Sequence, residues 1–287
     1  MKALRITVQF CSVILLAGFC VVSASAAGVI YSDLTGTPSA GLGSLGFEAY
    51  GAAEFGGIVQ PDYTNGSVVT GATVQMVNYA CHFTCATSFA GSNGYTGFGN
   101  ATGYNAKLTL SLYNVDPVTG QVGSLIQSDA ITTLIDWATN SPLVQAATFT
   151  FAAPVSGDFI YGLSFNTQDY GASPTGLAGP YNSLNVGLTL DLPTTGTNPA
   201  LINVSGDPAS IPSTNYYDSA YWNNQNGLWL SGGIQGVFSQ DSQWVSAGWG
   251  SGVIAFDATN SPEPATFGLI GFGLLALAVA ARKKARA

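Results

Sequence analysis

The chain has 287 residues, of which 47% are hydrophobic and only 8% are charged, and its formal net charge is −8. Between residues 27 and 260 a single cation, Lys107, stands against fourteen carboxylates, so this stretch has a net charge of −13. Nucleic-acid binding relies on Lys and Arg side chains that neutralise phosphates, and this composition therefore excludes it.

The first 26 residues have the order of a secretory signal peptide. Lys2 and Arg5 precede an apolar segment from Phe10 to Val22, and the small residues 24–26 follow it. Charged, apolar and small segments in this order predict export, with cleavage after Ala26.

Residues 27–260 are predicted to form one β-rich body. The clearest strand is Ala106–Asn114, where leucines alternate with polar residues, the period of two that places one face in a core. The turn signal at residues 116–120 follows, so Val122–Gln127 is expected to return as the partner strand. A second pair is expected between Ala147–Ala152 and Phe159–Asn166, around a turn at residues 154–158.

Other segments give strand signals of varying strength. They are Val29–Tyr31, Phe47–Tyr50, Ser67–Ala80, Asn185–Leu192, Gly227–Phe238 and Val253–Asp257. Strands separated by turns, with no helical period between residues 27 and 260, predict an all-β fold. We expect an antiparallel β-sandwich or jelly roll that forms a single domain.

Cys81 and Cys85 are the two cysteines that remain once the signal peptide is removed. An even pair in an oxidising compartment favours a local disulfide. His82, the only histidine, follows Cys81, but a zinc site at these three residues would lack a fourth ligand and the usual spacing. We expect a disulfide, no metal ion, and a structural role for His82.

Aromatic residues concentrate between Tyr216 and Trp249, amid Asn and Gln. Rings that stack on sugar faces, with amides that bond hydroxyls, are typical of carbohydrate-binding surfaces. Trp222, Trp229 and Trp244 are therefore candidate sugar-binding residues. The competing and favoured interpretation is that these rings fill the core of a sandwich that is short of Leu and Ile.

The carboxylates leave two further alternatives. A glycoside hydrolase needs only two carboxylates in a cleft, although most Asp residues here stand beside Pro, Gly or Asn, as turn formers do. Asp33, Asp62, Asp218 and Asp241 offer loop oxygens to Ca²⁺, but no alternating Asp/Asn run defines a calcium loop. We expect a protein that is not an enzyme and has no cofactor.

The last 27 residues, 261–287, combine a short motif, an apolar segment and a basic tail. Pro262, Glu263 and Pro264 precede 17 uncharged residues, 265–281. At about 1.5 Å rise per residue, a helix over this segment is just long enough to cross a thin membrane. The basic tail, 282–287, is expected to stay in the cytoplasm.

This arrangement closely resembles the PEP-CTERM sorting signal. The resemblance implies that Pro262, Glu263 and Pro264 are recognised by a membrane peptidase of the exosortase type, and that the helix holds the protein in the inner membrane until then. It also implies an outer-membraned bacterium that makes exopolysaccharide, which becomes a candidate partner. The expected location is the outer cell surface or the extracellular matrix.

Parts of the body are similar to stretches of uncharacterised secreted bacterial β-sandwich proteins, which implies a fold and no activity. These parts are residues 110–114, 123–126, 160–167 and 180–188. The leading interpretation is an exported, surface- or matrix-associated protein that is not an enzyme. A carbohydrate-binding module for exopolysaccharide is the first alternative, and a two-carboxylate glycoside hydrolase is the second.

Overall fold

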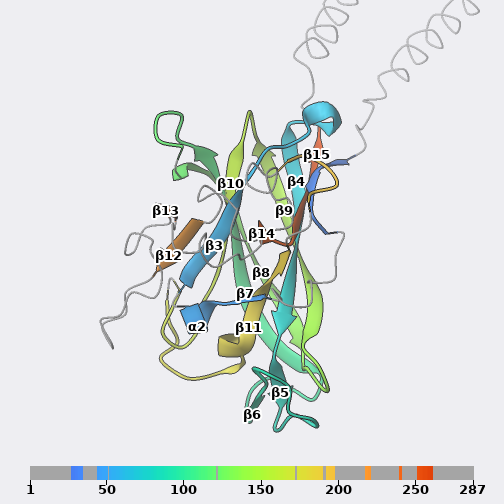
Figure 1. Cartoon of the computed structure of the whole chain (residues 1–287), viewed down its shortest axis with the longest axis vertical. Coiled ribbons are helices and arrows are strands. Elements are labelled where there is room, and N and C mark those ends of the chain that lie inside the picture. The colour runs from blue at the N-terminus through green and yellow to red at the C-terminus, as the bar shows by residue number, and fades with distance from the viewer. Residues whose placement is uncertain are drawn as a thin grey trace, which may run out of the picture.

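A computed structural model describes residues 27–34, 44–50, 52–120, 122–171, 173–189, 192–197, 217–220, 239–240 and 251–260. They form two large antiparallel sheets that share one apolar core, and a small two-stranded sheet at one end (Figure 1). The prediction of an all-β fold with antiparallel sheets is confirmed.

The first sheet is organised around β4 (Val68–Asn78). On one side β4 pairs with β9 (Leu143–Pro154) over its whole length. On the other side it pairs with β15 (Ile254–Thr259) and then with β11 (Leu184–Thr189). The outer members are β1 (Gly28–Ser32), beside β15, and β2 (Ser44–Gly46) and β14 (Ser251–Gly252), both beside β11.

The second sheet has the strand order β13-β12-β3-β10-β7-β8. These strands are β13 (Ser239–Gln240), β12 (Tyr217–Ala220), β3 (Ala52–Val59), β10 (Phe159–Phe165), β7 (Gly103–Val115) and β8 (Val122–Asp136). The predicted hairpin between β7 and β8 is present. In its turn the Asp116 carboxylate accepts hydrogen bonds from the N–H groups of Val118 and Thr119, at 2.8 and 2.9 Å. β8 continues to Asp136, nine residues beyond the predicted strand end at Gln127.

The core lies between the two sheets and follows the predicted alternation. Leu108, Leu110 and Leu112 of β7 are fully buried, as are Val74 and Met76 of β4. Large aromatic side chains complete the core from both sheets: Tyr31, Phe55, Tyr104, Phe149, Phe159 and Phe256. The scarcity of Leu and Ile is thus offset by buried Phe and Tyr residues in this part of the chain.

Two sequence expectations are wrong. Residues Phe47–Tyr50 form a single turn of helix, α2, instead of a strand. This turn brings the Phe47 ring onto the Phe165 ring, with 4.3 Å between centroids, which closes one end of the core.

β9 and β10 do not form a hairpin, because they lie in different sheets. The connection after Pro154 crosses between the sheets, with Val155 buried and its N–H donating to the Ser67 carbonyl at 2.8 Å. Alternation marks a buried face on each strand, but it does not specify which strand lies next to it.

The chain enters and leaves the body at the same end. Gly28 lies opposite Ala258, and Val68 lies opposite Thr259. Gly66 packs beneath this exit with φ +134°, where an added Cβ would lie 2.3 Å from the Thr259 carbonyl carbon. Only glycine fits there.

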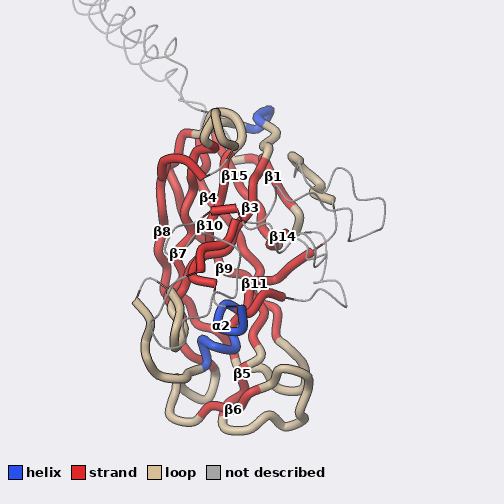
Figure 2. The backbone as a smooth tube through the Cα atoms, turned by 60° about the vertical axis from the view of Figure 1, so that its left-hand side comes forward, coloured by secondary structure: helices blue, strands red, loops and turns tan. Residues whose placement is uncertain are grey.

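The opposite end holds α2 and the small parallel sheet of β5 (Ala80–His82) and β6 (Asn93–Tyr95), as Figure 2 shows. The predicted strand Gly227–Phe238 lies outside the described residues, as do the signal peptide and the helix predicted at 265–281. Within the described ranges, no helix is long and apolar enough to cross a membrane.

Side chains join the free edges of β8 and β9, which belong to different sheets. Asp129 of β8 accepts a hydrogen bond from Thr150 N of β9 at 2.8 Å, and Gln127 accepts one from Ala152 N at 3.2 Å. The Gln145 side chain of β9 accepts a hydrogen bond from Asp136 N at 3.0 Å and donates one to the Leu134 carbonyl at 2.7 Å. We call this row of contacts the β8–β9 seam.

Candidate binding site

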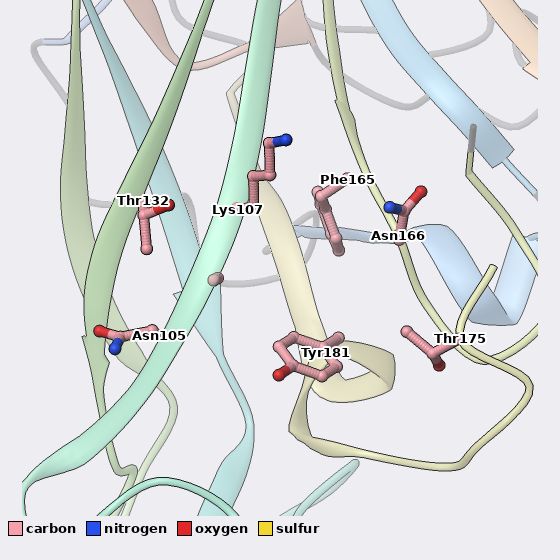
Figure 3. Close-up of a pocket in the computed structure, with 8 residues that line it drawn as sticks. Asn105, Lys107, Thr132, Phe165, Asn166, Thr175 and Tyr181 are labelled. Atoms are coloured by element: carbon pink, nitrogen blue, oxygen red, sulfur yellow. The ribbon is translucent and has the colours of Figure 1, made fainter. Parts of the chain in front are cut away.

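A pocket forms where β10 ends before its neighbour β7 does. Leu108 of β7 pairs with Phe165, the last residue of β10, so residues 103–107 of β7 have no β10 neighbour. Residues 166–171 and 173–183 curve around this space and lead back to β11. The resulting pocket has a volume of about 220 Å³ and is lined by Asn105, Ala106, Lys107, Thr132, Phe165, Asn166, Thr175 and Tyr181 (Figure 3).

The pocket has polar walls and an aromatic lining. Among the described residues, the polar side-chain groups of Asn105, Lys107 and Thr132 have no hydrogen-bond or ion-pair partner, and all three side chains are exposed. The Tyr181 ring stands edge-on to buried Tyr104, with 5.6 Å between centroids. Free amide, hydroxyl and ammonium groups beside aromatic rings can bind a small polar ligand.

The loop on the far wall is held by its own hydrogen bonds. Thr175 Oγ1 donates to the Thr167 carbonyl at 3.1 Å, and the Asn166 side-chain oxygen accepts from Ser173 N at 2.9 Å. Asn182 accepts from Gln168 N at 3.0 Å, which ties the two ends of the loop together. The loop therefore presents Asn166 and Thr175 on a fixed frame.

Glu48 of α2 anchors the same loop from behind. Its carboxylate accepts a hydrogen bond from the Thr167 hydroxyl and another from Asp169 N, the latter at 3.4 Å. Burial raises the pKa of Glu48, and the nearby Asp169 carboxyl contributes to the rise. The carboxyl groups of Glu48 and Asp169 therefore interact with each other, and Glu48 also holds the loop through its hydrogen bond with Thr167.

Glu54, on β3, is another partly buried carboxyl. Its Oε1 accepts a hydrogen bond from the Tyr113 hydroxyl at 2.9 Å. Burial raises the pKa of Glu54 to about 7, although this hydrogen bond opposes the rise. Gly162 leaves room for the carboxyl, since a Cβ there would lie 2.1 Å from Oε1.

Cys81 and Cys85 are bonded to each other, with 5.1 Å between their Cα atoms. The bonded sulfurs leave no thiolates for zinc, and the described residues contain no group of three metal-binding side chains. The His82 ring packs against the rings of Phe83 and Trp137, with centroids 3.9 and 5.5 Å away. Phe83 itself is 56% exposed and has φ +62°, so the disulfide loop projects a ring at the end of the body.

The candidate calcium ligands have other partners where the structure describes them. Buried Asp33 accepts hydrogen bonds from Ile254 N at 2.5 Å and from the Tyr31 hydroxyl at 3.1 Å, which joins β1 to β15. Asp62 caps the turn at Tyr63–Asn65 by accepting from Thr64 N at 3.0 Å. Nothing is described of the Asp218 side chain, and Asp241 lies outside the described residues.

The other predicted site residues also lie outside the described residues. These are Trp222, Trp229 and Trp244, and the motif residues Pro262, Glu263 and Pro264.

Residues 262–284 match the family model of the PEP-CTERM protein-sorting motif. The chain carries a PEP-CTERM sorting signal. This match confirms the resemblance seen in the sequence, and it covers less than a tenth of the chain. The PEP-CTERM motif implies an exported, envelope-directed protein that is processed by exosortase, a membrane protein.

The chain matches none of the curated proteins and none of the solved structures compared with it. The PEP-CTERM signal thus identifies the sorting route, and the role of the body has to be argued from its own structure. The likeness of body segments to secreted bacterial β-sandwich proteins stays a prediction.

Sequence reasoning did not find the pocket. It noted Lys107 as the only cation of the body but did not assign it to a site, and it did not select Asn105, Thr132 or Tyr181. A lone cation on an exposed strand position was the one usable signal. The other lining residues come together only because β10 ends early.

Proposed function

We propose that the body of this PEP-CTERM protein is a carbohydrate-binding domain, not an enzyme, displayed at the cell surface or in the extracellular matrix. The observation that carries the proposal is the pocket at the end of β10. There, amide, hydroxyl and ammonium groups without a partner among the described residues lie beside the Tyr181 ring. Sugars offer hydroxyls to such groups and apolar faces to such rings. Exopolysaccharide is the proposed partner.

The arrangement of carboxyl groups supports binding over hydrolysis. Glycoside hydrolases hold two carboxyl groups roughly 5–9.5 Å apart on either side of the bond they cleave. None of the eight residues that line the pocket is acidic. The carboxyl groups of Glu48 and Asp169 instead interact with each other, and Glu54 accepts a hydrogen bond from the Tyr113 hydroxyl.

The position of the pocket supports display away from the membrane. Asn260, which precedes the sorting segment, lies at the end where Val115 terminates β7, whereas the pocket lies beside Lys107. At about 3.3 Å per residue, these points on β7 are roughly 25 Å apart. We propose that a helix over residues 265–281 holds the chain in the inner membrane before processing, which leaves the pocket end directed outward.

A glycan array tests this function. The mature protein, purified from the native host, should retain one class of glycan, and Asn105→Ala should reduce that binding without lowering the melting temperature. Failure to retain any glycan would rule out the carbohydrate-binding proposal. The other candidate residues are tested by the same two measurements, glycan binding and melting temperature, which separate loss of binding from loss of fold. The variants are Trp222→Ala, Trp229→Ala and Trp244→Ala.

A further inference from the structure

Lys107 gives the pocket a distinct electrostatic character. It is the only Lys or Arg between residues 27 and 260, and it lines the pocket. Within the described part of the chain its ammonium has no carboxylate partner, and Figure 3 shows it extending from β7 beside Phe165 and Asn166. The one cation of a body with fourteen carboxylates thus lies at the pocket, without a carboxylate partner among the residues that the structure describes.

An unpaired ammonium favours an anionic ligand. A neutral ligand that covers Lys107 removes water from the charge and leaves it uncompensated, which is unfavourable. A carboxylate compensates the charge and forms a charge-assisted hydrogen bond, which is stronger than a neutral one. Negative charge that lies more than about 8 Å away is largely screened at physiological salt, so direct contact with Lys107 outweighs it.

The remaining lining limits the ligand to a small, hydroxyl-rich unit. Asn105 and Thr132 offer free polar groups on the β7–β8 side, Asn166 offers its amide N–H₂ on the loop side, and Tyr181 offers a ring. A volume of about 220 Å³ is below the roughly 300–1,000 Å³ of sites for drug-sized ligands. One sugar unit suits this space.

We infer that the pocket binds a sugar unit that carries a single carboxylate, and that Lys107 pairs with that carboxylate. This inference rests on the proposed carbohydrate-binding function and narrows it to acidic saccharides. Lys107 is a specificity-determining residue in this reading, whereas Asn105 contributes to binding whether or not the ligand is charged.

The experiment uses the full chain in detergent micelles and a matched pair of probes. Oligogalacturonate is compared with the same oligosaccharide after chemical reduction of its carboxyl groups, and free galacturonate tests whether one unit is enough. Binding is measured by calorimetry at physiological salt for wild type, Lys107→Gln, Lys107→Arg and Asn105→Ala. Ser128→Ala, an exposed change on β8, serves as the control.

Wild type should bind the acidic probe about tenfold more tightly than the reduced probe, as expected for one charge-assisted hydrogen bond. Lys107→Gln should remove this preference, and Lys107→Arg should keep most of it. Asn105→Ala should weaken both probes alike. Equal binding of both probes by wild type would overturn the acidic-sugar inference alone. If wild type bound neither probe and no glycan on the array, the carbohydrate-binding function would be overturned as well.

Discussion

We expect Glu54 to make the stability of the body depend on pH, because folding shields its carboxyl from water. Its pKa is about 7 in the folded protein, against 4.5 for an ordinary Glu side chain. A raised folded-state pKa means that the neutral form is favoured by folding. The contribution of the neutral Glu54 carboxyl to the free energy of unfolding is therefore fully present below about pH 4.5 and is lost as the pH rises through about 7.

We predict that Glu54→Gln removes this pH dependence. A shift of this size corresponds to roughly 3 kcal/mol in the free energy of unfolding. The difference in that free energy between wild type and Glu54→Gln should change by up to about this amount between pH 4.5 and 7.5, with the variant gaining relative stability as the pH rises. Urea unfolding across this range measures it, and a difference that stays constant with pH would contradict the assignment to Glu54.

At the residue scale, the sequence predicted contacts between near neighbours in the chain, but it did not predict the pocket. The proximity of Cys81 and Cys85 and the turn at Asp116 depend on neighbours within a few positions, and the structure shows both. The pocket joins Asn105 to Tyr181, which are far apart in the chain. Spacing and composition carry no information about such a meeting.

The β8–β9 seam is a feature of whole elements, because it joins two sheets that share no backbone ladder there. We predict that Asp129→Ala lowers the free energy of unfolding by about 1 kcal/mol, since it removes the acceptor of a partly exposed backbone N–H. Asp129→Asn keeps an acceptor and should cost less. Urea unfolding of both variants measures the difference.

Ser128→Ala is the matched control for the seam, because Ser128 is exposed on the same strand. Its free energy of unfolding should equal that of wild type. If Asp129→Ala were as stable as Ser128→Ala, the Asp129 hydrogen bond would contribute nothing measurable to the free energy of unfolding.

Strand positions followed from the sequence more readily than strand neighbours did. β4, β7 and β11 coincide with alternating apolar segments, because that pattern reports one buried face. β3 (Ala52–Val59) was missed because Ala and Gly give it no clear alternation. The hairpin expected between β9 and β10 failed for a different reason: β9 pairs with β4, which lies much earlier in the chain.

At the scale of the whole molecule, sorting is the property that a single substitution can test. Glu263→Ala should leave a membrane-held precursor if exosortase reads the Pro262-Glu263-Pro264 motif. Mass spectrometry and fractionation of the native host measure the mature mass and location. Ser261→Ala, one residue before the motif, is the control, and a Glu263→Ala protein that matches wild type in both measurements would reduce the motif to a linker.

The exit of the chain from β15 also has a mechanical consequence. β15 lies between β1 and β4, and Asn260 follows it directly. Hydrogen bonds of an antiparallel ladder stand perpendicular to the strands. A pull on Asn260 along β15, against a ligand held at the pocket end, would therefore load both ladders in shear and strain many bonds at once, instead of peeling them apart singly. Because forced unfolding is governed by the unfolding barrier, a body loaded in this way should resist unfolding under force.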